Sequence, residues 1–389
     1  MTLAKKLALG VALVLVAGFC ALPRIADRSM NQVARPADPF AISDAARRLH
    51  AELRIADLHA DPLLWPRDLI GGGAAGQVDL PRLIEGRIVL QVFGVPTQSP
   101  FGLNFERNSA ETFDMNTPLA IASGWAPRTY TSRLARALHQ AEVLREAAAE
   151  SEGRLTLIAT KGDLAQHLAR HAEDPQRSAG FLGLEGMHAL DGRVESLDEL
   201  HAAGFRMAGF AHFFDNAFAG SSAGEEKHGL TEHGREALAR IEALGMIADL
   251  AHASPATIRD VLALAKRPVV VSHTGVQATC PGPRNLSDGE IRGIAANGGV
   301  IGIGAFEGAV CDTAPRAVAR AMRHVRDLVG IEHVALGSDF DGAVTTAFDA
   351  SETALLVEAL FAEGFTPDEV RLALGENTLA LVAKLLPES

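Results

Sequence analysis

The chain alternates short apolar runs, each about as long as a β-strand, with segments whose apolar residues recur at the helical period. Eight such runs lie at 53–56, 88–93, 181–185, 205–210, 246–250, 268–272, 299–303 and 333–338. Helical patterns between and after them include 131–151, 234–244, 314–329 and 351–363. Because alternating strands and helices give parallel strands joined by right-handed crossovers, eight units close most simply into a barrel. We therefore predict an α/β protein with a (β/α)8 TIM-barrel fold.

A ninth apolar run, Leu155–Ala159, is assigned to an accessory strand or extended segment outside the barrel. The alternative fold is an open, doubly wound sheet, whose usual sign is a glycine-rich phosphate turn directly after the first strand. The glycines at 71–73 lie too far from the first strand to form that turn. The barrel is therefore preferred.

The composition indicates a globular protein and excludes one class of partner. Of 389 residues, 48% are hydrophobic and 22% are charged, which is enough apolar material for a large core. The net charge is −12, and no run rich in lysine or arginine follows the first residues. Since nucleic-acid binding needs a basic surface, the protein is not expected to bind nucleic acid.

The first residues have the composition of an export signal. Lys5 and Lys6 precede the uncharged stretch Leu7–Pro23. This stretch is short for a membrane-spanning helix and no clean A-x-A cleavage site follows it, so a signal anchor and a cleaved signal peptide both stay open. We expect an exported protein, periplasmic or anchored in the inner membrane facing the periplasm, that contacts the membrane only through this segment.

The chain is divided into three parts. Residues 1–29 are the signal peptide or anchor, residues 30–40 are a polar linker with two prolines, and residues 41–389 are the barrel domain. The domain is predicted to open with a helix over 42–50, for which Ser43 or Asp44 is the N-cap.

Histidines and carboxylates end or follow six of the apolar runs. They are His59, Asp61, Glu185, His212, His252, His273 and Asp339. Residues at the carboxyl ends of barrel strands converge on one place, and His59 and Asp61, two apart, share one face of a strand. Such ligands suit zinc and its first-row neighbours, and the carboxylate of Glu185 can bridge two ions. The pattern predicts a two-metal site that activates water.

A single histidine after a strand is more often structural than a metal ligand. The prediction therefore depends on the whole set rather than on any member. The other histidines, including His188 three residues after Glu185, are interpreted as surface or structural residues.

Six short motifs give the chain a resemblance to a known family. They are Asp-Leu-His-Ala-Asp at 57–61, Gly-Leu-Glu-Gly-Met-His at 183–188, Asp-Leu-Ala-His at 249–252, Val-Ser-His at 271–273, Pro-Arg-Asn-Leu at 283–286 and Gly-Ser-Asp-Phe-Asp-Gly at 337–342. From about His50 to its end, the chain resembles the membrane dipeptidase (renal dipeptidase) family, peptidase family M19, of the amidohydrolase superfamily. The resemblance implies two Zn²⁺ per chain, one on His59 and Asp61, one on His252 and His273, with Glu185 bridging both.

The resemblance also implies roles for three further groups and a substrate. His212 would bind the scissile carbonyl, Arg284 the terminal carboxylate of the substrate, and Asp339 would move the proton. The implied reaction is attack of a hydroxide held by both metals on the peptide bond of a small dipeptide, including dipeptides with a C-terminal D-residue. A homodimer is also implied.

Two departures from the family pattern limit what is carried over. Ala60 stands where many members have asparagine, which leaves the ligands in place but removes a neighbouring polar group. The stretch 213–218 lacks the polar, tryptophan-containing sequence expected there. Since this loop borders the substrate, the side-chain preference is not carried over.

Cys280 and Cys311 are the cysteines outside the leader. In a cytosolic enzyme such a pair would be buried thiols, whereas after export it can form a disulfide. Its placement resembles a disulfide of the mammalian members of the family, and this favours the bridge.

Two other functions are weighed against dipeptide hydrolysis. A two-metal hydrolase acting on a lactone, ester or cyclic amide is disfavoured by Arg284, because such substrates often lack a carboxylate at that place. An inactive envelope protein that uses the barrel as a binding scaffold would be expected to lose ligands, and here the ligand positions are all kept.

Overall fold

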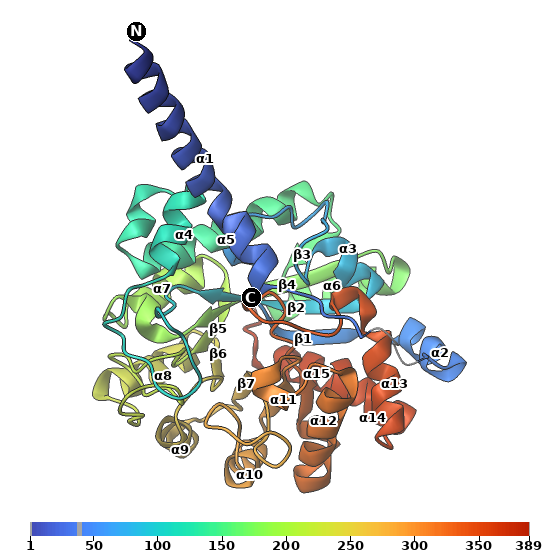
Figure 1. The fold of residues 1–389 in the computed structure, drawn as a ribbon. Helices are drawn as coiled ribbons and strands as arrows, with labels where there is room; N and C mark the ends of the chain where they lie inside the picture. The colour runs from blue at the N-terminus through green and yellow to red at the C-terminus, as the bar shows by residue number, and fades with distance from the viewer. Residues whose placement is uncertain (1, 37–40, 389) are drawn as a thin grey trace.

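The computed structural model describes residues 2–36 and 41–388, without the side chains of residues 8–16. Parallel strands form a closed barrel surrounded by helices (Figure 1). The barrel strands are β1 (Ile55–Ala60), β2 (Ile88–Pro96), β4 (Ser178–Glu185), β5 (Phe205–Gly209), β6 (Ile247–Asp249), β7 (Val270–Thr274), β8 (Val300–Ile303) and β9 (Val334–Leu336). Pairing of β9 with β1 and of β2 with β4 closes the ring, so the predicted TIM barrel is confirmed.

One strand lies outside the ring. β3 (Leu155–Leu157) pairs with Ser178–Gly180 at the start of β4, which confirms the predicted accessory segment. The ends of the barrel strands differ from the prediction in detail. His59 and His273 lie inside β1 and β7 rather than after them, because strand pairing continues past the last apolar residue.

The helices surround the barrel and connect its strands. They are α2 (Asp44–Glu52), α3 (Leu80–Glu85), α4 (Asn116–Ala122), α5 (Arg133–Glu150), α6 (Lys161–Glu173), α7 (Ser196–Ala202), α8 (Glu232–Ala243), α9 (Pro255–Leu264), α10 (Asp288–Ala296), α11 (Glu307–Val310), α12 (Pro315–Val329), α13 (Ala354–Ala362), α14 (Pro367–Arg371) and α15 (Asn377–Leu385). The predicted helices correspond to α2, α5, α8, α12 and α13. Ser43 caps α2 by accepting a hydrogen bond from the Ala46 N–H, as expected.

The barrel strands are buried on both of their faces. Every residue of β1, β2 and β4 is buried, as expected for parallel strands covered on both faces. Helix α15 adds Leu379, Val382 and Leu385 to a buried cluster that includes Ala56 and Val89, near the beginnings of β1 and β2. The amino ends of these strands are therefore covered by α15, and the carboxyl ends are left for the site.

Helix α1 (Leu3–Met30) projects away from the barrel and only its last turns lie against it (Figure 1). The predicted leader includes residues 8–16, whose side chains lie outside the described part of the chain. Among the residues that were described, no helix is long and apolar enough to cross a membrane.

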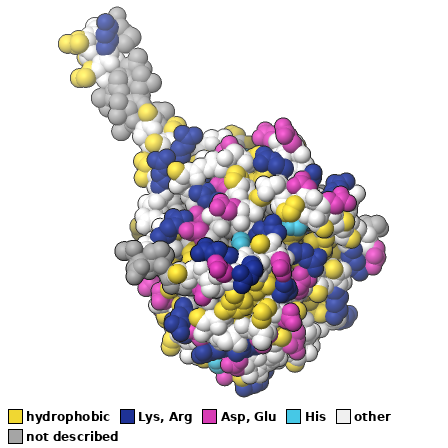
Figure 2. All heavy atoms as spheres, turned by 90° about the vertical axis from the view of Figure 1, so that its right-hand side faces the viewer, with side chains coloured by type: hydrophobic (Ala, Val, Ile, Leu, Met, Phe, Trp, Pro, Cys, Tyr) yellow, Lys and Arg dark blue, Asp and Glu magenta, His cyan; other side chains and the backbone are white. Residues whose placement is uncertain are grey.

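The segment after α1, predicted as a linker, follows the barrel surface. Val33 forms a β-bridge with Thr346, and Arg35 pairs with Asp349 and Glu352. Residues 37–40 of the predicted linker lie outside the described residues. On the face drawn in Figure 2, acidic and basic side chains are interspersed rather than gathered by sign.

Candidate metal centre

The structure brings the predicted histidines and carboxylates together at the carboxyl end of the barrel. All of them are buried: His59, Asp61, Glu185, His212, His252, His273 and Asp339. They form three overlapping groups, each with ligand atoms within 4.8 Å of one another. The groups are His59, His273 and Asp339; Glu185, His212 and His252; and His59, Asp61 and Glu185. Because the strand ends of a barrel converge, these residues form one site.

Glu185 occupies the middle of this site. Its Oε1 lies 3.5 Å from Nε2 of His59, 3.2 Å from Nε2 of His252 and 3.5 Å from Nε2 of His273. On one side, His59 Nε2 is 3.2 Å from Asp61 Oδ1. On the other, the Nε2 atoms of His252 and His273 face each other at 2.9 Å. A carboxylate between two such pairs is placed to ligate an ion on either side.

Unsatisfied polar atoms in the cluster test whether it fits metal ions. Among the described residues, His59 Nε2, Asp61 Oδ1 and Glu185 Oε2 are buried without a hydrogen-bond partner. Leaving such groups unpaired costs free energy, so native proteins rarely do so. A divalent cation would satisfy these nitrogen and oxygen donors together, and the cluster therefore fits metal ions.

The orientation of His273 also suits a metal ligand. The Ser272 hydroxyl donates to Asp249 Oδ2 at 2.6 Å and lies 3.0 Å from His273 Nδ1. Since the hydroxyl proton goes to the carboxylate, the serine oxygen accepts the Nδ1–H of the imidazole. The Nε2 of His273 is then unprotonated and directed at Glu185, as ligation requires.

A second pair repeats this arrangement at β1 and β9. Asp57 Oδ2 accepts from the Ser338 hydroxyl at 2.6 Å, and Asp57 Oδ1 accepts from the Ser338 N–H at 2.8 Å. Ser338 directly precedes Asp339, just as Ser272 precedes His273. These residues lie within the sequence motifs at 57–61, 249–252, 271–273 and 337–342, but the motifs alone assign them no role. The sequence signal for this role is a repeat: a serine directly precedes a site residue, and the neighbouring strand carries an aspartate shortly before a histidine.

Gly94 on β2 is another residue that the sequence analysis missed. A Cβ atom at this position would lie 2.1 Å from Asp61 Oδ1 and 2.5 Å from His59 Cε1. Only glycine leaves room for both ligands. A single glycine in an apolar strand indicates such a close approach only when the residues of the neighbouring strand are known.

Burial shifts the pKa of most groups in the site. It raises the pKa of Glu185 well above its usual value and that of Asp339 to about 7. It lowers the pKa of His212 to about 3. Burial also disfavours protonation of His59, but the charges of Asp61 and Glu185 outweigh it and raise the pKa to about 10. Burial thus disfavours the charged forms of Glu185 and Asp339, and bound cations would stabilise them.

Arg284 lines the same cavity as Glu185, His212 and Asp339. This cavity has a volume of about 620 Å³. Its Nη2 donates to the His273 carbonyl at 2.8 Å. Its Nε has no hydrogen-bond partner among the described residues, although it is buried. A guanidinium held in this way can receive a carboxylate from a ligand.

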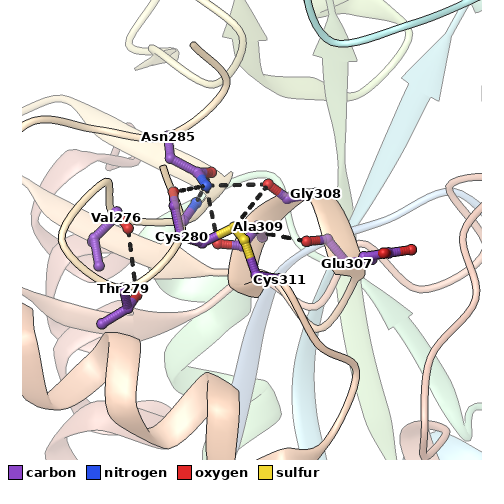
Figure 3. Close-up of a disulfide and its surroundings, with 9 residues drawn as sticks. Val276, Thr279, Cys280, Asn285, Glu307, Gly308, Ala309 and Cys311 are labelled. Atoms are coloured by element: carbon purple, nitrogen blue, oxygen red, sulfur yellow. Dashed lines mark hydrogen bonds between the residues drawn. A yellow bond between two sulfur atoms is a disulfide. The ribbon is translucent and has the colours of Figure 1, made fainter. Parts of the chain in front are cut away.

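A disulfide holds the loop that carries Arg284. Cys280 and Cys311 are bridged, which confirms the predicted pair (Figure 3). The Asn285 amide donates to the carbonyls of Cys280, Gly308 and Ala309, so it ties the loop to α11 (Figure 3).

Two other predictions concern residues around the site. His188 is buried and its Nε2 lies 3.0 Å from the Thr97 hydroxyl, consistent with the structural role predicted for it. In the atypical stretch 213–218, Phe213 lines the cavity. This loop therefore does border the space in which a ligand would bind.

A closed (β/α)8 barrel with a buried histidine and carboxylate centre at its carboxyl end is the architecture of a metal-dependent hydrolase. The family model described as membrane dipeptidase (Peptidase family M19) matches residues 43–385. The chain belongs to this family.

Curated relatives include dipeptidase aclJ of Aspergillus oryzae, 35% identical over 218 residues that cover 54% of this chain and 52% of that protein. Dipeptidase tcpJ of Claviceps purpurea is 27% identical over 320 residues, covering 80% and 70% respectively. The chain thus spans about half the length of the first of these relatives.

Solved structures confirm the fold. The probable dipeptidase PvdM from Pseudomonas aeruginosa superposes with a TM-score of 0.73 at 20% identity, covering 89% of this chain and 98% of that one. A metallopeptidase from Rhodobacter sphaeroides, solved with a phosphinate mimic of the dipeptide L-Ala-D-Ala, gives a TM-score of 0.69 at 24% identity, covering 86% and 99%.

Proposed function

We propose that this protein is a zinc-dependent dipeptidase that holds two ions and hydrolyses the peptide bond of small dipeptides. The observation that carries the proposal is the position of Glu185 between the pair His59 and Asp61 and the pair His252 and His273. Membership of the M19 family, dipeptidase relatives and a structural neighbour holding a dipeptide mimic support it.

These contacts support the ligand sets that the family resemblance implies. His59 and Asp61 would hold one ion, His252 and His273 the other, and Glu185 would ligate both. When bound, two divalent cations lower the pKa of water and draw electrons from a carbonyl.

Arg284 would bind the terminal carboxylate of the dipeptide, and His212 would bind its scissile carbonyl. The guanidinium of Arg284 donates two parallel hydrogen bonds to the carboxylate of the dipeptide, which fixes the substrate in the cavity. Because burial keeps the pKa of His212 at about 3, its imidazole is neutral and carries one N–H. That N–H donates to the scissile carbonyl oxygen and stabilises the negative charge that develops there.

Asp339 would move the proton. Its Oδ1 lies 3.8 Å from His59 Nε2, beside the ligand cluster. As water adds to the peptide carbon, Asp339 accepts the proton that water loses. The C–N bond then breaks, and Asp339 gives this proton to the leaving amine.

We also infer that the protein acts after export. The basic residues Lys5 and Lys6 before an apolar stretch support a signal peptide or anchor. The bridge between Cys280 and Cys311 supports it independently, because disulfides persist in oxidising compartments. Fractionation of cells that express the tagged chain tests this, and recovery in the cytosol with free thiols would contradict it.

Metal analysis combined with a substrate panel tests the proposed activity. The full-length protein is expected to contain two zinc ions per chain and to hydrolyse L,L and L,D dipeptides, with activity lost on chelation. Glu185→Ala should lose metal, and Asp339→Asn should keep metal but lose turnover. Hydrolysis of lactones, esters or cyclic amides without cleavage of any dipeptide would overturn the proposal.

A further inference from the structure

The last turns of α1 are packed onto the barrel rather than free in solvent. Pro23 and Asp27, four residues apart and hence on one face of the helix, are both buried. Ala26 lies on the same side and packs against a cluster that contains Leu64 and Trp65, which follow β1. This end of α1 therefore belongs to the folded body, although the sequence placed it in the leader (Figure 1).

A buried ionic network fixes the position of the helix end. Asp27 Oδ2 lies 3.2 Å from Arg67 Nε, and Arg67 Nη2 lies 2.7 Å from Asp341 Oδ2. Asn31 donates to Asp27 at 2.8 Å and accepts from the Ala343 N–H at 2.9 Å. Since a buried charge is costly without its partner, Asp27 and Arg67 hold the helix end against the loop that follows Asp339.

The same helix end lines the substrate cavity. Leu22, Ile25 and Met30 are among its lining residues, together with Arg284 and Asp339 at the reacting end. Further walls are apolar, formed by residues such as Leu103, Phe105, Phe213 and Phe306. The volume of about 620 Å³ falls within the range of about 300 to 1,000 Å³ typical of sites for drug-sized ligands, larger than the smallest dipeptides need.

We propose that residues 22–30 of α1 form a wall of the substrate site and give the enzyme a preference for dipeptides with bulky apolar side chains. This inference rests on the proposed dipeptidase function. Leu22, Ile25 and Met30 line the cavity and stay 50%, 58% and 44% exposed, so a bulky apolar side chain would cover them and be favoured by the area removed from water. A leader cut between residues 22 and 30 would remove this wall from the enzyme.

The test compares kcat/KM for Leu-Leu and Ala-Ala in the full-length, zinc-loaded protein purified in detergent. In the double variant L22S/I25S, the ratio of the two values should fall about tenfold, the lower end of the effect of losing a methylene contact in a pocket. Arg28→Ser, on the same turns but outside the cavity lining, is the matched control and should leave the ratio unchanged. Asp27→Ala, which releases the helix end, should lower the ratio at least as much as the double variant.

Two results would overturn the inference. One is an unchanged ratio in L22S/I25S, and the other is an equal fall in Arg28→Ser. Failure of the parent enzyme to hydrolyse any dipeptide would instead contradict the proposed function, so the two failures are distinguishable. Binding of zinc by all variants, measured in parallel, separates loss of the wall from loss of the metal site.

Discussion

At the scale of single residues, Ser272 determines which nitrogen of His273 carries a proton. We predict that Ser272→Ala lowers metal affinity about 10- to 100-fold, the usual effect of removing a group that orients a ligand. The reason is that Nδ1 of His273 loses its acceptor, while Asp249 loses a donor. Competition with a fluorescent chelator measures the affinity.

A buried serine away from the site is the matched control. Ser196 is buried and donates to the Leu190 carbonyl, so Ser196→Ala should lower stability without changing metal affinity. Equal metal affinity in Ser272→Ala and the parent would contradict the orienting role.

The metal ligands could be predicted from the sequence, but the groups that orient them could not. His59, Glu185 and His252 differ from the apolar runs around them, and the barrel brings strand ends together. Asp249 and Ser272 have a role only because β6 and β7 are neighbours, so that a carboxylate on one strand reaches a hydroxyl on the next. That pairing is a property of the sheet.

At the scale of elements, β2 supports the site by carrying no side chain at Gly94. We predict that Gly94→Ala destabilises the fold by about 1 to 3 kcal/mol, as expected for overpacking, and abolishes binding of the ion next to Asp61. The added Cβ would overlap Asp61 and His59. Thermal unfolding and metal content measure the two effects.

Gly289 in α10 provides the control for this substitution. A Cβ there would meet only the Ser287 hydroxyl, at 3.9 Å, so Gly289→Ala should be neutral or slightly stabilising. Full metal content in Gly94→Ala would show that β1 and β2 can move apart, contrary to the prediction.

The bridge between Cys280 and Cys311 stabilises the loop of Arg284 and α11. Because the two cysteines are separated by 31 positions in the sequence, C280S/C311S should lower the free energy of unfolding by about 3 to 4 kcal/mol. It should also raise KM, because the bridge and Asn285 hold the segment next to Arg284. Urea unfolding and dipeptide kinetics check both effects, and a variant as stable as the parent would refute the first.

Most element types were predictable, whereas several ends were not. The helix predicted over 351–363 starts at Ala354, because Asp349 caps a short 3-10 turn at Ala350–Glu352 first. β2 runs on to Pro96, past its predicted end at Phe93, since it continues to pair with β4. Local patterns define each element, and contacts with neighbouring elements decide where it stops.

At the scale of the whole molecule, the repeated strand and helix units made the barrel predictable. The packing of α1 onto the barrel was not, because a basic and apolar start indicates a leader whatever it later contacts. Nothing local distinguishes Asp27, which is buried, from Arg24 and Arg28, which are exposed. Its ion-pair partner, Arg67, lies 40 positions further along the sequence.

The protein buries several neutral histidines, so its stability should fall in acid. Burial lowers the pKa of His139, His171 and His201, and that of His167 to about 4. In the unfolded chain these groups titrate near pH 6.5. As the pH falls from 6.5 towards 4, the unfolded state therefore binds more protons than the folded state, and the folded state loses stability.

His167 isolates this effect away from the metal centre. It is buried and its Nε2 donates to the Val89 carbonyl at 3.0 Å, a bond that a glutamine amide can replace. Between pH 7.5 and pH 5, the free energy of unfolding of His167→Gln should fall by about 1 to 2 kcal/mol less than that of the parent. Urea titrations of the zinc-loaded proteins measure both. This substitution removes one titrating group and leaves the metal ligands in place. If the free energy of unfolding falls equally in both proteins, His167 is protonated as readily in the folded state as in the unfolded state, contrary to the prediction.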